Sequence, residues 1–248
     1  MKILATIVTG MIAQGVFAAG INIDPVAGID MGGSPVTNLP EPEFPGDAAT
    51  KAYIDRLLGI SGVTGDAPVE RTGQTSTYAD GDDGNLQRGV PWPNPRFTDN
   101  QDGTVTDNLT GLVWLTKANC IATDNPGFDT EGTAGDGLVT WQTALEFVAG
   151  INSATYDCGD ISNGDSNQTD WRLPNEKELY SLIDFSRYDP AVAESNMFSD
   201  LQSNWYWSST TLFGSSGTIA WIVYFYDGDK GGGNIGSGYY VWPVRAGE

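Results

Sequence analysis

The 248-residue chain contains no histidine, only two cysteines, and only 12 lysines and arginines against 32 aspartates and glutamates. Without histidine there is no imidazole general base, which excludes Ser-His-Asp and Cys-His catalysis. Structural zinc sites use histidine or several cysteines, so the composition also argues against zinc. The formal net charge of −20 repels phosphate backbones, so nucleic acid is not an expected partner.

Residues 1–18 have the features of a secretory signal peptide. An apolar run that ends at Ala18 follows the positive Lys2, and Val16-Phe17-Ala18 before Ala19 fits the small-residue rule for signal peptidase. The run is shorter than the ~20 residues of a membrane-spanning helix, although a membrane anchor is the alternative interpretation. No later stretch is long and apolar enough to span a membrane. We therefore expect an exported chain that is extracellular, at the cell surface or periplasmic.

Export places the two cysteines in an oxidising compartment, where Cys120 and Cys158 are expected to form a disulfide. The bond would close a loop of about 38 residues, which the chain-entropy model values at roughly 3–4 kcal/mol. A reactive thiol pair is the alternative. The sequence offers neither a CxxC spacing nor a neighbouring histidine that would lower the pKa of either thiol.

Composition divides the chain into two parts. All eight tryptophans lie at or after Trp92, and a core needs such bulk, so we expect one globular domain at residues 61–248. Residues 19–60 carry many prolines and glycines and should form an extended stalk. Within this stalk, Asp47 is the expected N-cap of a short helix at residues 47–58.

The stalk helix would be marginal alone in water, so its apolar stripe needs a partner surface. Segments 36–40 and 47–55 resemble a stalk element of phage tail fibres and similar trimeric fibrous proteins. This resemblance implies a homotrimer. The alternative is a helix that folds back onto its parent domain.

Two turn signals, Asp102-Gly103 and Thr110-Gly111, predict antiparallel strands between residues 97 and 115. Two helices should follow. Asn175 should cap the second of these in a near capping box with Glu178. The first should begin after Thr140 and bury one stripe, made of Trp141, Ala144, Leu145, Val148 and Ala149.

From Asn204 onward the pattern is that of strands. Residues 205–210, 219–226 and 239–244 predict three strands of an antiparallel meander, with a turn at 227–229. Two helices in the first half of the domain and a meander in the second half predict an α+β fold.

Many short motifs occur in a fixed order in this domain: Gly73-Gln74-Thr75, Gly81-Asp82-Asp83-Gly84, Trp92-Pro93-Asn94-Pro95-Arg96-Phe97-Thr98-Asp99, Asp102-Gly103-Thr104-Val105-Thr106-Asp107, Thr110-Gly111-Leu112-Val113-Trp114, Asp170-Trp171-Arg172-Leu173-Pro174-Asn175, Glu178-Leu179, Tyr206-Trp207-Ser208-Ser209-Thr210 and Val244-Arg245. Together they resemble the Lcl C-terminal domain family of exported bacterial proteins, over about residues 70–247. The resemblance implies a fold similar to C-type lectins and to the formylglycine-generating-enzyme group.

The adhesin domain that gives this family its name is trimeric and binds sulfated glycosaminoglycans. The present chain has no collagen repeat and its basic residues are scattered singly, so we do not expect it to hold a sulfated polyanion. Formylglycine formation needs a reactive cysteine, whereas both cysteines here are assigned to a disulfide.

Carboxylates crowd several glycine-rich turns. Asp99, Asp102 and Asp107 surround one of them, and carboxylate and carbonyl oxygens are the ligands that Ca²⁺ requires. The spacing misses the EF-hand pattern, and aspartate as a turn former on a solvated surface is the alternative. Calcium is the one candidate cofactor.

The segment Asp170-Trp171-Arg172 places an acid and a base beside a tryptophan. A ligand contact is one interpretation. The favoured interpretation is a buried ion pair of Arg172 that fixes the loop before the second helix.

Aromatic side chains near the end of the chain form the candidate ligand site. Because side chains alternate along a strand, these rings cannot all be buried on one face. Rings beside amides and hydroxyls suit sugars or protein surfaces, although a role in the core is the alternative. The candidate residues are Tyr224, Tyr226, Asp229, Asn234, Tyr239 and Tyr240.

We therefore expect a noncatalytic recognition or adhesion module whose partner is an extracellular glycan or protein surface. The alternative is an extracellular hydrolase that uses carboxylates alone. Two carboxyls about 5–9 Å apart in one concave pocket, one with a raised pKa, would favour the enzyme. An open aromatic surface would favour recognition.

Overall fold

A computed structural model describes four segments of the chain, residues 22–24, 28–30, 69–164 and 166–247. The chain divides into two compact units, Met1–Val63 and Thr64–Glu248. In the first unit, β1 (Asn22–Asp24) pairs antiparallel with β2 (Gly28–Asp30).

Two predictions for the N-terminal part lie outside the described residues, namely the signal peptide at 1–18 and the stalk helix at 47–58. Both stay predictions, and so does the homotrimer that the stalk helix implies. None of the helices in the described segments is long and apolar enough to cross a membrane.

The first sheet of the second unit has the strand order β3-β4-β5-β9 and is antiparallel throughout. Its strands are β3 (Phe97–Asp99), β4 (Thr104–Asp107), β5 (Leu112–Leu115) and β9 (Val244–Ala246). The three strands predicted between residues 97 and 115 are thereby confirmed. Glycine is required in the turn before β4, because Gly103 has a φ of +85° and a Cβ there would overlap the carbonyl oxygen of Gly159.

The second sheet is a meander of β6 (Trp205–Thr211), β7 (Ile219–Tyr224) and β8 (Lys230–Asn234). The prediction of its third strand at 239–244 was wrong. The end of that segment enters β9 in the first sheet, and the glycine-rich segment after the turn forms β8 instead.

Glycine has no side chain, and this explains why a glycine-rich segment forms β8. A Cβ on Gly233 would lie 2.7 Å from the ring of Tyr239, 3.0 Å from Cγ2 of Ile222 and 3.1 Å from the ring of Trp207. The bare backbone of Gly233 therefore lets these side chains pack directly on the strand.

Both predicted helices are present, as α5 (Trp141–Asn152) and α6 (Glu176–Tyr180). The capping box of α6 is confirmed, since the Asn175 side chain accepts hydrogen bonds from the N–H groups of Lys177 and Glu178. The predicted stripe of α5 needs one correction, because Ala149 is exposed. The buried residues of α5 are Ala144, Phe147, Val148 and Ile151.

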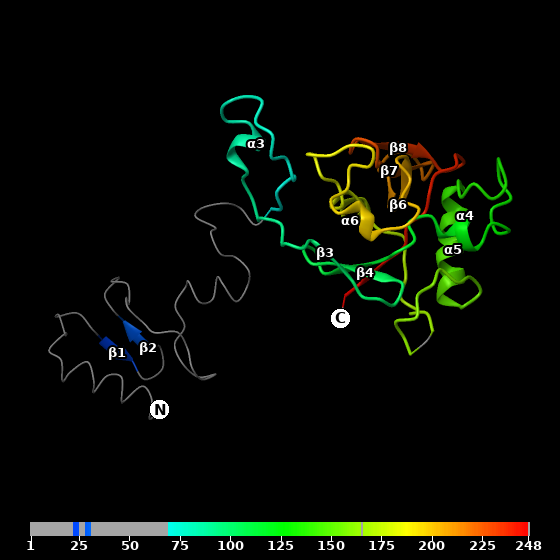
Figure 1. Ribbon diagram of the computed structural model, residues 1–248, viewed down its shortest axis with the longest axis horizontal. Helices are drawn as coiled ribbons and strands as arrows, with labels where there is room; N and C mark the ends of the chain where they lie inside the picture. Colours follow the sequence, from blue (N-terminus) through cyan, green and yellow to red (C-terminus); the bar gives the residue numbers. More distant parts are fainter. Residues whose placement is uncertain (1–21, 25–27, 31–68, 165, 248) are drawn as a thin grey trace. The chain divides into compact units, whose positions relative to one another are not determined.

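Three shorter elements complete the unit: α3 (Asp83–Leu86), α4 (Cys120–Asp124) and the 3-10 helix η1 (Ser195–Met197). Figure 1 shows the β6-β7-β8 sheet and the β3–β4 hairpin on opposite sides of the unit, with α4 and α5 at one flank. Few, short helices beside two antiparallel sheets are consistent with the predicted α+β class.

Trp242 joins the two sheets through one core. Its ring centroid lies 5.3 Å from that of Trp114 in β5, 6.0 Å from that of Tyr206 in β6 and 4.8 Å from that of Phe198. The predicted disulfide between Cys120 and Cys158 is present, and both cysteines are buried.

Candidate functional site

Four aromatic side chains meet at the surface where β7 ends, and we call them the aromatic row: Tyr188, Trp205, Tyr224 and Tyr226. Trp205 and Tyr224 are direct partners across β6 and β7, and their rings stack with centroids 4.6 Å apart and planes at 19°. The ring of Tyr226 lies 5.8 Å from that of Tyr224 and 6.3 Å from that of Tyr188. Tyr188 is 73% exposed and Tyr226 is 40% exposed, so the row opens to solvent.

Phe225 fixes the row from below. This residue is fully buried, and its ring lies 4.9 Å from that of Tyr206 and 5.8 Å from that of Trp242. Its N–H donates to the carbonyl of Asn204, and its own carbonyl accepts from the N–H of Ala191. Because Phe225 enters the core, its two tyrosine neighbours remain at the surface.

The adjoining loops are also held in place. The N–H of Asp189 donates to the carbonyl of Tyr226 at 2.7 Å, which ties the Tyr188 loop to the end of β7. Gly228 has a φ of +85°, and a Cβ there would lie 2.6 Å from Cγ2 of Ile183. The turn after β7 therefore packs closely on the segment that follows α6.

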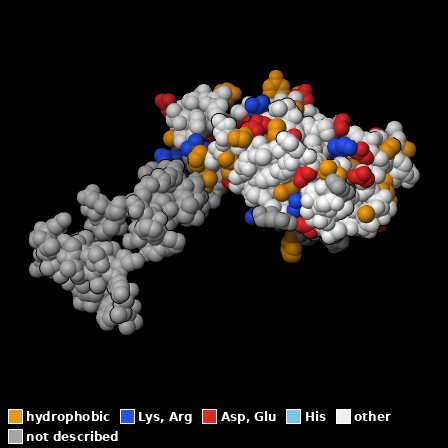
Figure 2. Space-filling view, turned by 60° about the horizontal axis from the view of Figure 1, so that its bottom comes forward, with side chains coloured by type: hydrophobic (Ala, Val, Ile, Leu, Met, Phe, Trp, Pro, Cys, Tyr) orange, Lys and Arg blue, Asp and Glu red, His pale blue; other side chains and the backbone are white. Residues whose placement is uncertain are grey.

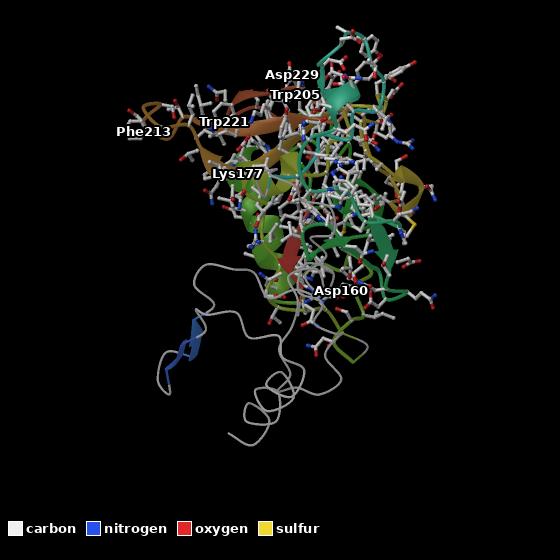
Figure 3. All side chains as sticks on the ribbon, turned by 90° about the vertical axis from the view of Figure 1, so that its left-hand side faces the viewer. Asp160, Lys177, Trp205, Phe213, Trp221 and Asp229 are labelled. Atoms are coloured by element: carbon white, nitrogen blue, oxygen red, sulfur yellow. A yellow bond between two sulfur atoms is a disulfide. The ribbon has the colours of Figure 1, made fainter. Side chains whose placement is uncertain are left out.

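The structure brings together only part of the predicted ligand site. Tyr224 and Tyr226 belong to the row, and Asp229 is exposed in the same turn, close to Trp205 in Figure 3. Asn234 lies at the opposite end of β7, where it pairs with Ile219.

Two further residues of the predicted ligand site, Tyr239 and Tyr240, pack against other aromatic rings and do not belong to the row. The Tyr239 ring packs against Trp207, with centroids 4.7 Å apart, and is only partly exposed. Tyr240 is only 9% exposed and packs against Tyr206, so its prediction as a ligand contact is corrected. Burial raises the pKa of the Tyr240 hydroxyl.

Sequence reasoning missed Tyr188 as a site residue. Tyr188 belongs to no strand or helix, so no period-2 or helical pattern marks it. Trp205 begins the strand predicted at 205–210, but its direct pairing with Tyr224 depends on the register of β6 and β7.

The three aspartates predicted for calcium do not converge. Asp107 is buried in an ion pair with Arg96, at 3.2 Å between Oδ2 and Nη2. Asp99 and Asp102 each accept a hydrogen bond from the backbone N–H two residues further on. Within the described ranges, no group of three or more acidic or cysteine side chains is arranged to hold a metal ion. Figure 2 likewise shows acidic side chains scattered over one face of the second unit.

Arg172 forms an ion pair, but its partner and exposure differ from the prediction. Its Nη1 and Nη2 lie 2.6 and 2.7 Å from the two carboxylate oxygens of Glu178, not from Asp170, and its side chain is 43% exposed. Burial alone would raise the pKa of Glu178, but hydrogen bonds from Arg172 and from the N–H of Asn175 lower it. This pair stabilises the first turn of α6.

A groove of about 700 Å³ lies between α6 and residues 69–72, and we call it the acidic groove. Its carboxylates are Glu70, Glu176 and Glu178. Glu176 is paired with Lys230 at 2.7 Å, and Glu178 is paired with Arg172. Partial burial raises the pKa of Glu70. Among the described residues, no side-chain hydrogen bond reaches the Glu70 carboxyl.

A family model described as the Lcl C-terminal domain matches residues 103–245, more than half of the chain. The matched range includes the second sheet, the aromatic row and the disulfide. No curated protein is similar enough to the chain to count as a match. The chain therefore belongs to the Lcl C-terminal domain family.

Proposed function

We propose that the chain is an exported, noncatalytic recognition module that binds a carbohydrate or protein surface through the aromatic row. The observation that carries this proposal is the open group of four rings, two of them well exposed, above a buried anchor at Phe225. Tyrosine and tryptophan combine a large apolar face with a polar edge, and they lose little conformational entropy on binding.

The row also needs little ordering before it binds. Trp205 and Tyr224 already stack, and the Tyr188 loop is already bonded to the end of β7. A surface fixed in advance avoids much of the entropic cost of association, so a small aromatic patch can bind measurably.

Carboxylates around the row narrow the class of partner. Asp189, Asp227 and Asp229 are exposed within a few residues of the row. Together with the net charge of −20, they disfavour an anionic partner. Carboxylate oxygens accept hydrogen bonds well from hydroxyl groups, so a neutral glycan is the partner that we favour.

The same proposal includes a C-type-lectin-like fold for the second unit and a proline-rich stalk that gathers three copies. Three linked sites would strengthen weak individual binding. Light scattering of the mature protein with and without residues 19–60 tests this part: we expect a trimer that becomes a monomer when the stalk is removed. An unchanged mass would contradict the role of the stalk.

The binding proposal is tested by a screen against glycans and extracellular proteins, followed by variants of the row. For a partner found in this way, Tyr188→Ala and Tyr226→Ala should each lower the affinity about tenfold or more. Phe213→Ala is the matched control, because Phe213 is a fully exposed ring in the loop between β6 and β7, at the other end of β7 (Figure 3). Normal binding by both row variants would refute the proposal.

One observation favours the second candidate function, a hydrolase that uses carboxylates alone. Two carboxyls of the acidic groove have pKa values displaced in opposite directions, raised for Glu70 and lowered for Glu178, as an acid and base pair requires. Against this function, Glu176 and Glu178 already hold ion pairs. A panel of glycoside and ester substrates decides: turnover by the native chain that is lost in Glu70→Gln would favour the enzyme.

A further inference from the structure

A second pocket, of about 630 Å³, lies on the first sheet and contains no residue of the aromatic row. Its floor is formed by Thr106 of β4, Val113 of β5 and Arg245 of β9, which are direct neighbours in the strand register. Its wall is the loop that contributes Ser162 and Gln168. We call this site the Arg245 pocket.

Arg245 is a buried cation without a carboxylate partner in the described part of the chain. The residue is 8% exposed, and its Nε is buried without a hydrogen bond. Its Nη1 donates to the carbonyl oxygen of Ala246 at 3.4 Å, and its guanidinium carbon lies 5.8 Å from the centroid of the Trp171 ring, so both of these contacts are with neutral groups. By contrast Arg96, which is 1% exposed, is paired with Asp107. An unpaired buried charge is costly, so the guanidinium of Arg245 offers a strong site for an anion.

A buried carboxylate, Asp160, holds the two wall residues Ser162 and Gln168. Asp160 is buried and accepts hydrogen bonds from the N–H groups of Ser162 and Gln168 and from the indole N–H of Trp171. Burial alone would raise the pKa of Asp160, but these hydrogen bonds outweigh it and lower the pKa. Asp160 therefore holds the wall of the pocket in place and forms no ion pair with Arg245.

We propose that the Arg245 pocket binds a small organic monocarboxylate that carries hydroxyl groups. The planar guanidinium fork matches a carboxylate through two parallel hydrogen bonds. A single negative charge is favoured over a dianion, because Asp102 also lines the pocket and the chain is strongly acidic.

The remaining polar groups that line the pocket would form hydrogen bonds with the hydroxyl groups of the ligand. The side-chain amide of Gln168 makes no hydrogen bond to a described residue, so it is available as donor and acceptor. Asp102 and Thr106 add oxygen atoms to the lining, and Thr106 is the direct strand partner of the apolar Val113. The volume of about 630 Å³ lies in the range of small-molecule sites.

The test is a titration of the full mature protein with D-gluconate at constant ionic strength. It follows the indole N–H of Trp171 and the amide of Gly247 by nuclear magnetic resonance. D-glucose is the neutral control, acetate lacks the hydroxyl groups, and sulfate is a dianion. We expect saturable shifts with gluconate, weaker binding of acetate and sulfate, and no shift with glucose.

Variants then assign the binding to the pocket. Arg245→Lys should weaken gluconate binding by about tenfold or more, since lysine cannot reproduce the fork. Gln168→Ala changes only a partly exposed loop residue, so it keeps the test valid if Arg245→Lys folds poorly, and it should weaken binding about three- to tenfold. Arg187→Lys is the matched control, since it makes the same change at an arginine outside the pocket, and it should bind normally.

Three results would overturn the proposal: equal shifts with glucose and gluconate, tighter binding of sulfate than of gluconate, or normal gluconate binding by folded Gln168→Ala and Arg245→Lys proteins. The proposal is independent of the aromatic row. Tyr226→Ala should leave gluconate binding unchanged, so failure at one site is distinguishable from failure at the other.

Discussion

Replacing both Cys120 and Cys158 by alanine removes the bond that closes a loop of 38 residues. The chain-entropy model values a loop of this length at about 3–4 kcal/mol, because the unfolded chain regains its freedom. Helix α5 lies inside the loop and buries Phe147 and Ile151 in the core, so the native loop has its own packing contacts. We therefore expect the variant to fold, with a lower free energy of unfolding.

The expected loss can be converted into a melting temperature. For a domain of this size, each kcal/mol shifts Tm by about 2–4 °C, so 3–4 kcal/mol corresponds to roughly 6–16 °C. Both cysteines are buried, so the truncation adds a small cavity contribution in the same direction.

Scanning calorimetry of the native protein and the double variant, each with and without reductant, measures this effect. The variant should be insensitive to reductant, while the native protein should approach the variant when reduced. A loss below about 1 kcal/mol would show that the bond does not constrain the unfolded chain, and would refute the reasoning.

Three further predictions concern charged groups. Asp107→Ala leaves Arg96 buried without its partner and should reduce the free energy of unfolding by about 3–5 kcal/mol in urea titration, whereas a near-neutral effect would mean that solvent reaches the guanidinium. Hydrogen bonds hold the pKa of Asp160 below its unfolded-state value, so its stabilisation is present above about pH 4 and is lost as the pH falls through the folded-state pKa. Asp160→Asn should flatten that acid dependence of stability, and an unchanged acid slope would contradict the assignment. Calcium removal by a chelator should leave Tm unchanged, because Asp99, Asp102 and Asp107 are engaged separately; a lower Tm would reveal a site that forms on binding.

Local chemistry made much of the fold predictable. The strands between residues 97 and 115 follow from two turn signals, and the capping box of Asn175 and Glu178 is visible in four consecutive residues. The disulfide follows from the presence of two cysteines and the inferred export. Each of these features depends on neighbours in sequence or on simple counting.

The features that the sequence did not predict depend on packing between distant segments. A run of glycines is typical of a loop, yet Gly233 lies in a strand because Trp207 and Tyr239 pack on its bare backbone. Tyrosine is a residue type that suits a binding surface, but the ring of Tyr240 packs against that of Tyr206.

The candidate sites could not be predicted in full from the sequence for the same reason. Tyr188 joins Tyr226 only through tertiary structure. The position of Arg245, which has no carboxylate partner among the described residues, depends on the register of β9 beside β5. These features require knowledge of which distant segments meet.

The central claim is that a partner binds on the aromatic row, and ring-resolved nuclear magnetic resonance of the complex tests it most directly. With the first glycan or protein found by screening, the ring signals of Tyr188 and Tyr226 should shift and saturate together, while those of Phe213 stay unchanged. Shifts confined to Phe213 or to the acidic groove around Glu70, with the row unaffected, would contradict the claim.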